Sequence, residues 1–67
     1  MKLEDILNSD LVTDDDPIQL TIFDDGLPLR ENWKGNMFSD QITEHSALEV
    51  TQVIYTQRRG WFIYLRR

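Results

Sequence analysis

Apolar side chains near the N-terminus recur with the spacing of one helical face. Leu3, Ile6 and Leu7 stand at positions i, i+3 and i+4, and Leu11 continues the series. The two residues between Leu3 and Ile6 are acidic, which suits the first turn of a helix because the helix dipole favours negative charge there. Turn-forming residues and a proline follow over residues 8–17. The pattern therefore predicts a short N-terminal helix that ends before them.

A half-buried strand is predicted over residues 18–23, where apolar and polar side chains alternate until the last step. An Asp-Gly step follows at residues 25–26 and is typical of a hairpin turn, because glycine adopts the positive φ that such turns require. Pro28 is tolerated at the start or the edge of a sheet strand. The returning strand is therefore predicted as a short edge strand near residues 30–34.

Residues 37–45 are interpreted as a loop or a single helical turn, in which Phe38 and Ile42 stand four apart and can face the core together. From residue 48 to residue 65 the chain is rich in β-branched and aromatic side chains, with one interruption at residues 56–60. This pattern predicts a second hairpin.

The turn of the second hairpin is expected at residues 58–60, with Gly60 in the left-handed conformation. This register pairs Tyr55 with Ile63 and Val53 with Leu65. Because side chains alternate across a strand, the hairpin then has two different faces. The core face carries Val53, Tyr55, Trp61, Ile63 and Leu65, and a mixed face carries Val50, Gln52, Ile54, Thr56, Phe62, Tyr64 and Arg66.

These elements predict one α+β domain over residues 1–67. A short N-terminal helix packs on a small, strongly twisted antiparallel sheet of about four strands, arranged as two hairpins. Hydrophobic residues make up 40% of the chain and charged residues 28%, which is enough for a folded core. Two arrangements remain open at this point: the sheet closes into a barrel-like core, or one aromatic face stays exposed and adhesive.

The chain contains no cysteine, which excludes disulfides, a thiolate nucleophile and a cysteine-based zinc site and fits a reducing compartment. Its longest apolar run, residues 61–65, is far shorter than the roughly 18 residues of a membrane span. Acidic residues stand where a signal peptide carries its positive region. We expect a cytoplasmic protein that does not bind membranes.

The net charge of −5 conceals an uneven distribution along the chain. Residues 1–49 hold all 12 acids, whereas residues 50–67 hold four arginines and no acid. An acidic protein is repelled by nucleic acid as a whole and is steered towards basic partners. One interpretation is that the arginines pair with acids elsewhere in the fold. Another is that the acidic part acts as a decoy of a nucleic-acid-binding protein.

No catalytic or metal-binding pattern is predicted. His45 lies between Glu44 and Ser46, but neighbours in sequence point in different directions and do not form a triad across a cleft. The consecutive acids at residues 14–16 diverge and lack the alternating ligands of a calcium loop, so they are interpreted as a solvated turn. A glycine-rich phosphate loop is also missing from the sequence. The predicted protein is not an enzyme and has no cofactor, metal or small-molecule substrate.

The second hairpin combines arginine and aromatic side chains, which are the residues that dominate protein-binding hot spots. We therefore predict a non-enzymatic protein-interaction module that binds an unknown protein partner or forms a homodimer. The same mixture also occurs on platforms for single-stranded nucleic acid, and nucleic-acid binding through the arginine-bearing hairpin is the alternative. The predicted contact residues are Tyr55, Arg58, Arg59, Trp61, Phe62, Tyr64 and Arg66.

Four segments also carry a resemblance: MKLEDIL at residues 1–7, IQLTIFDDG at 18–26, EVTQVI at 49–54 and WFIYL at 61–65. In this order they resemble small, uncharacterised phage- and prophage-encoded proteins of Gram-positive bacteria. The resemblance implies an accessory factor encoded by a mobile element. It implies no activity, and it carries over no catalytic or binding residues.

Overall fold

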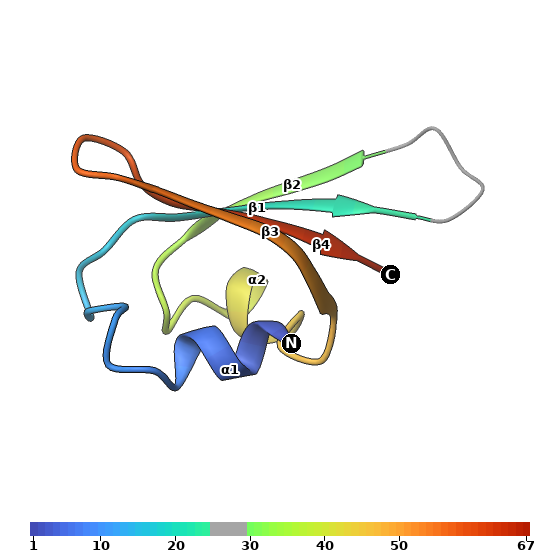
Figure 1. Cartoon of the computed structure of the whole chain (residues 1–67), viewed down its shortest axis with the longest axis horizontal. Coiled ribbons are helices and arrows are strands. Elements are labelled where there is room, and N and C mark those ends of the chain that lie inside the picture. Colours follow the sequence, from blue (N-terminus) through green and yellow to red (C-terminus); the bar gives the residue numbers. More distant parts are fainter. Residues whose placement is uncertain (25–29) are drawn as a thin grey trace.

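The computed structural model of the protein describes residues 1–24 and 30–67. In these residues a four-stranded sheet has two short helices packed on one of its sides (Figure 1). The Asp-Gly turn predicted at residues 25–26 lies outside the described residues. The elements in chain order are α1 (Leu3–Leu7), β1 (Ile18–Phe23), β2 (Arg30–Gly35), α2 (Asp40–Thr43), β3 (Glu49–Thr56) and β4 (Gly60–Arg66).

The strand order is β2-β1-β4-β3, so the two predicted hairpins lie side by side. Pairing is antiparallel within each hairpin, but β1 and β4 are parallel neighbours at the centre of the sheet. The prediction of a purely antiparallel sheet is therefore wrong. After β2 the chain passes along the helix side through α2 and enters β3 at the far edge. The sheet stays open rather than barrel-like, because β2 and β3 lie at opposite edges.

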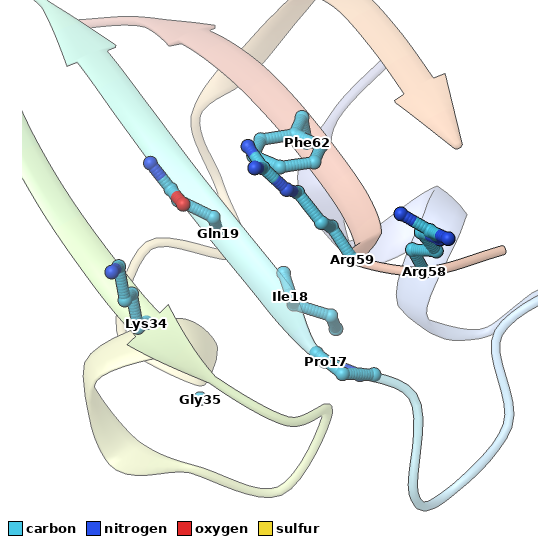
Figure 2. Close-up of a pocket in the computed structure, with 8 residues that line it drawn as sticks. All are labelled: Pro17, Ile18, Gln19, Lys34, Gly35, Arg58, Arg59 and Phe62. Atoms are coloured by element: carbon cyan, nitrogen blue, oxygen red, sulfur yellow. The ribbon is translucent and has the colours of Figure 1, made fainter. Parts of the chain in front are cut away.

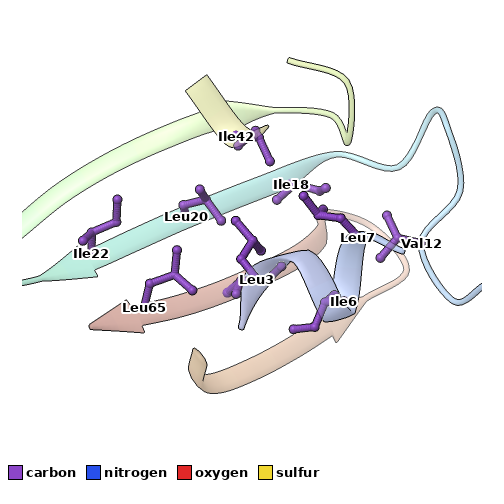
Figure 3. Close-up of a cluster of buried hydrophobic side chains, with 10 residues drawn as sticks. Leu3, Ile6, Leu7, Val12, Ile18, Leu20, Ile22, Ile42 and Leu65 are labelled. Carbon is purple, nitrogen blue, oxygen red and sulfur yellow. The ribbon is translucent and has the colours of Figure 1, made fainter. Parts of the chain in front are cut away.

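The core lies between the central strands and the two helices (Figure 3). The alternation predicted for β1 is confirmed, since Ile18, Leu20 and Ile22 are all buried on the helix side. Leu11 is exposed and Val12 is buried in its place, because α1 ends at Leu7 and helical spacing no longer applies there. The buried core comprises Leu3, Ile6, Leu7, Val12, Ile18, Leu20, Ile22, Ile42, Ile63 and Leu65.

The single helical turn expected in the middle segment is present as α2. Ile42 is fully buried, as predicted, but Phe38 is exposed. The reason is local: Ser39 is the N-cap with extended backbone, so Phe38 precedes the helix and does not share its face. No helix in the described parts of the chain is long and apolar enough to cross a membrane.

The second hairpin is present, with a register two residues away from the predicted one. Tyr55 pairs with Trp61 and Val53 with Ile63. A shift of two keeps the side chains of residues 52–66 on their predicted sides of the sheet. Val53 and Tyr55 were predicted in the core, which is wrong: they lie on the helix side but are exposed, because β3 is at the edge of the sheet. Val50 lies on the other side from the one predicted, because a bulge between Val50 and Gln52 inserts an extra residue. Val50 therefore lies opposite Leu65 and packs against the core, and its predicted place on the mixed face is wrong.

Gly60 joins the second hairpin to the start of β1. Its φ is +80°, a conformation that residues other than glycine rarely adopt. A Cβ at this position would lie 2.3 Å from the carbonyl oxygen of Pro17. The next amide, that of Trp61, donates a hydrogen bond of 2.8 Å to the same oxygen. Glycine is thus required here both for the turn and for the close approach of the two hairpins.

We predict that Gly60→Ala destabilises the protein by about 1–3 kcal/mol, because the left-handed backbone is strained by a side chain and Pro17 must move. Urea unfolding measures the change. The matched control is Gln57→Ala in the same turn, where the side chain is exposed and a change within about 0.5 kcal/mol is expected. Equal unfolding midpoints for the two variants would contradict this account of Gly60.

Candidate binding surface on the open face of the sheet

Neither α1 nor α2 covers the side of the sheet that faces away from the core, and we call this side the open face (Figure 1). The strand registers assign three side chains to it from each of β1, β2 and β4 and four from β3. They are Arg30, Asn32 and Lys34 of β2; Gln19, Thr21 and Phe23 of β1; Phe62, Tyr64 and Arg66 of β4; and Glu49, Gln52, Ile54 and Thr56 of β3.

Aromatic rings occupy the two central strands of the open face. Phe23 and Tyr64 are stacked, with ring centroids 6.3 Å apart and an interplanar angle of 20°. On the other side of Phe23, the guanidinium of Arg30 lies 5.3 Å from its ring centroid, within cation–π range. Phe62 and Ile54 stand opposite each other in the β3–β4 register. The centre of the face is therefore apolar and aromatic.

The charges of the open face are mostly positive. Its cations are Arg30, Lys34 and Arg66, and Glu49 is the single carboxylate among its described positions. Glu49 stands opposite Arg66 at the end of β3, where its carboxylate binds the Met1 ammonium at 3.2 Å. This arrangement separates the basic open face from most of the 12 acids of the chain.

Arg67, the last residue, is paired with acids instead. Its guanidinium lies 3.3 Å from the carboxylate of Asp24 and 2.6 Å from that of Glu31. Intramolecular pairing of the C-terminal arginines, one of the sequence-based interpretations, is thus seen for Arg67. Within residues 1–24 and 30–67, no carboxylate pairs with Arg58, Arg59 or Arg66.

An open cavity of about 430 Å³ lies at the end of the sheet where the second hairpin turns (Figure 2). Arg58 and Arg59 of the turn line it together with Lys34 at the end of β2. Phe62 and Gln19 contribute from the open face. Three cations beside an aromatic ring form an environment suited to a carboxylate or a phosphate group.

The structure divides the predicted contact residues between the two sides of the sheet. Phe62, Tyr64 and Arg66 lie on the open face, and Arg58 and Arg59 border it at the cavity. The other two predicted residues are on the helix side. There the rings of Tyr55 and Trp61 pack with centroids 4.8 Å apart, and Trp61 is packed against the core.

The side chain of Trp61 is hydrogen-bonded to the acidic turn that precedes β1. Its indole Nε1–H donates to an oxygen of Asp16 at 3.1 Å, and the backbone N–H of Thr13 donates to the same oxygen at 3.0 Å. These two bonds, that of Thr13 first, lower the pKa of the Asp16 carboxyl from its ordinary value of 3.8. Asp16 thus orders the turn around Trp61.

Sequence reasoning missed Phe23, Arg30 and Lys34, which complete the open face. The pattern of one hairpin does not report them, because they join this surface only through the parallel pairing of β1 with β4. A signal was present in the sequence: Phe23 breaks the alternation of residues 18–23 and occupies a position that should face away from the core.

The remaining candidates for chemistry lie outside this surface. The ring of His45 packs beside Trp33, and its Nδ1 lies 2.8 Å from the carbonyl oxygen of Gln41, to which it donates. Asp14 and Asp15 are exposed. In the part of the chain that the structure describes, no three His, Asp or Glu residues are grouped to hold a metal ion.

Comparison of the chain with protein-family models, with curated proteins and with solved structures finds no match. The resemblance to phage- and prophage-encoded proteins therefore stays a prediction.

We predict that the Trp61 indole N–H resonance shifts on acidification with a midpoint below pH 3.8, the ordinary carboxyl pKa, because the hydrogen bonds of the folded state lower the pKa of Asp16. The indole of Trp33 provides the internal control in the same NMR titration. The hydrogen bonds of Asp16 stabilise the fold above the ordinary carboxyl pKa and are lost as the pH falls through the lowered one.

The stability difference between wild type and Asp16→Ala should accordingly be full near neutral pH and shrink on acidification through that lowered pKa. A difference that is independent of pH would show that the ionised carboxylate is not what Trp61 and Thr13 recognise.

Proposed function

We propose that the protein is a non-enzymatic protein-interaction module that binds an acidic protein surface with the open face of its sheet. The observation that carries this proposal is the composition of the open face. In a chain with 12 acids, its described positions combine Phe23, Phe62 and Tyr64 with three cations and a single carboxylate, that of Glu49, which pairs with the Met1 ammonium.

The distribution of these residues matches the anatomy of protein interfaces. Such interfaces have an apolar, aromatic centre within a polar rim, and arginine and tyrosine are enriched among their strongest contacts. Here Phe23, Phe62, Tyr64 and Ile54 form the centre, and Arg30, Lys34 and Arg66 lie around it. Positive charge at the rim accelerates the approach of an acidic partner and rejects basic ones.

Two observations favour a protein over nucleic acid. A polynucleotide is anionic along its whole length and is repelled by the net charge of −5, whereas a protein can carry its acids in one patch that faces only the cations of the open face. In addition, the Phe23 ring has Tyr64 as its neighbour on one strand and Arg30 on the other, which leaves less of its surface for a stacked base. A protein with an acidic patch beside an apolar one satisfies both conditions, because it contacts the cations and the apolar centre together.

The test compares two double substitutions of apolar residues by serine, Phe62→Ser with Tyr64→Ser on the open face and Leu11→Ser with Phe38→Ser elsewhere on the surface. Proteins retained from a bacterial lysate by the immobilised wild type are quantified for each. We expect the amount of one specific, acidic protein that is retained to fall at least about tenfold for the open-face variant. The control variant should retain as much of this protein as the wild type does. Circular dichroism checks that both variants fold.

Two results would overturn the proposal. The first is retention of the same proteins by the open-face variant. The second is unfolding of that variant while the control stays folded, since Phe62 and Tyr64 would then be required for the core and not for contact.

Binding of single-stranded nucleic acid is the second candidate, and the cavity at the turn favours it. Lys34, Arg58 and Arg59 all line it, and Arg59 lies beside Phe62 (Figure 2), which supplies cations and an aromatic ring for phosphate and base binding. The molecule measures 34 × 22 × 20 Å, and charges are screened over about 8 Å at physiological ionic strength. Acids on the helix side therefore do not prevent a polyanion from approaching the open face.

For this candidate we predict that a labelled oligothymidine binds at low salt and dissociates as salt rises. Arg58→Ala with Arg59→Ala should reduce the slope of log K against log salt by about 1.4, because two phosphate contacts are lost. Arg67→Ala is the control, since Arg67 is paired with Asp24 and Glu31 and should leave the slope unchanged. Fluorescence anisotropy measures both. Absence of binding at the lowest salt would eliminate nucleic acid as the ligand.

A further inference from the structure

Strand β3 forms one edge of the sheet, and most of its outer side is unpaired. The N-terminal residues cover only its beginning, where Lys2 forms a bridge with Glu49 and the Val50 amide donates to the Met1 carbonyl oxygen at 2.8 Å. Beyond that point, no backbone hydrogen bond among the described residues reaches residues 51–56 from outside the sheet. A row of N–H and C=O groups is therefore available to another strand.

The opposite edge, β2, is protected. Helix α2 packs against it, and the Gln41 side-chain amide donates to the Lys34 carbonyl oxygen at 2.8 Å. The strand also carries Arg30, Glu31 and Lys34, and charged residues on an edge oppose strand addition. The two edges of this sheet are thus different, and β3 is the one that can accept a partner strand.

The side chains of β3 suit a second copy of the same strand. No charged residue occurs over residues 50–57, and Val53, Ile54 and Tyr55 are 36%, 40% and 51% exposed. In a two-fold symmetric contact each residue meets its own copy or a symmetric neighbour, so like charges repel and neutral apolar residues do not. The open face, with three cations and one carboxylate, would repel itself in such a contact.

We propose that two copies of the chain pair through the outer edges of β3, antiparallel and around a two-fold axis, to form one continuous eight-stranded sheet. The open-face residues of both copies must lie on the same side of this sheet. Because side chains alternate along a strand, this requires one residue of β3 to pair with its own copy across the two-fold axis. The exposed stretch is centred on Val53 and Ile54, so the axis lies at one of these two residues. The two open faces then form one extended surface. This inference stands independently of what that surface binds.

The first test is the mass of the protein by light scattering over a concentration series up to about 1 mM, because an edge contact is smaller than the ~800 Å² per partner of a standard interface. We expect the wild type to approach twice the 8.0 kDa of one chain. Val53→Lys, which introduces like charges at the two-fold axis, should remain at the mass of one chain. The control Asn8→Lys adds the same charge at the end of α1 and should behave as the wild type does.

The second test uses single cysteines, since the natural chain has none. Val53→Cys and Ile54→Cys are made separately, and the cysteine at the axis lies within disulfide distance of the same cysteine in the second copy. Asn32→Cys is the control, because it lies on β2 at the far edge of the sheet. We expect disulfide-linked dimers to form at least tenfold faster for one of the β3 variants than for Asn32→Cys. This comparison holds even where Val53→Lys fails to fold.

A wild type that keeps the mass of one chain at every concentration would overturn the proposal, as would equal crosslinking at position 32. A dimer that resists Val53→Lys but is lost with Phe62→Ser and Tyr64→Ser would also overturn it, because the copies would then meet through their open faces. Val53 lies on the helix side of the sheet, so Val53→Lys leaves the open face unchanged and the two proposals fail separately.

Discussion

The parallel pairing of β1 with β4 is the interaction on which the rest of this structure depends. Each hairpin is a local structure, but neither has a hydrophobic partner until the two central strands lie side by side. The pairing places Ile18, Leu20 and Ile22 next to Ile63 and Leu65. These five side chains are the part of the core that the sheet contributes. The main-chain contact between Pro17 and the Gly60 turn fixes the start of this pairing and leaves no room for a side chain at position 60.

One-sided coverage of the sheet follows from the size of the chain. The crossover from β2 to β3 and the N-terminal segment both lie on the same side, where α1 and α2 cover the buried strand positions. A chain of 67 residues has little left to cover the other side. Its aromatic side chains consequently remain partly exposed, and they are accompanied by cations because the acids lie mostly in the helices and turns. This segregation of charge gives a chain with a net charge of −5 one surface on which cations outnumber acids.

The same topology makes the two sheet edges unequal. The crossover brings α2 against β2, so that edge is shielded by a helix as well as by its own charges. The beginning of β3 is covered by the first residues of the chain, and its remainder is not. Edge strands that lack charges, proline or cover are normally avoided in monomers because they recruit further strands. The unpaired stretch of β3 is therefore the part of the sheet where another strand can be added.

Local patterns in the sequence determined the kinds of elements and the inward side of most strands. The spacing of Leu3, Ile6 and Leu7 and the alternation in residues 18–23 are consequences of helix and strand geometry, which short-range order alone specifies. Gly60 likewise identified the second turn, although the turn lies at residues 57–59 instead of 58–60 and the register is two residues away, because alternation does not encode the residue at which a turn begins. Only the tertiary structure decided that β1 and β4 are parallel, that the sheet stays open, and that Phe23, Arg30 and Lys34 share a face with Phe62 and Tyr64. These features depend on contacts between residues some 40 positions apart in the chain, and a short-range pattern does not report which of two possible neighbours a strand will meet.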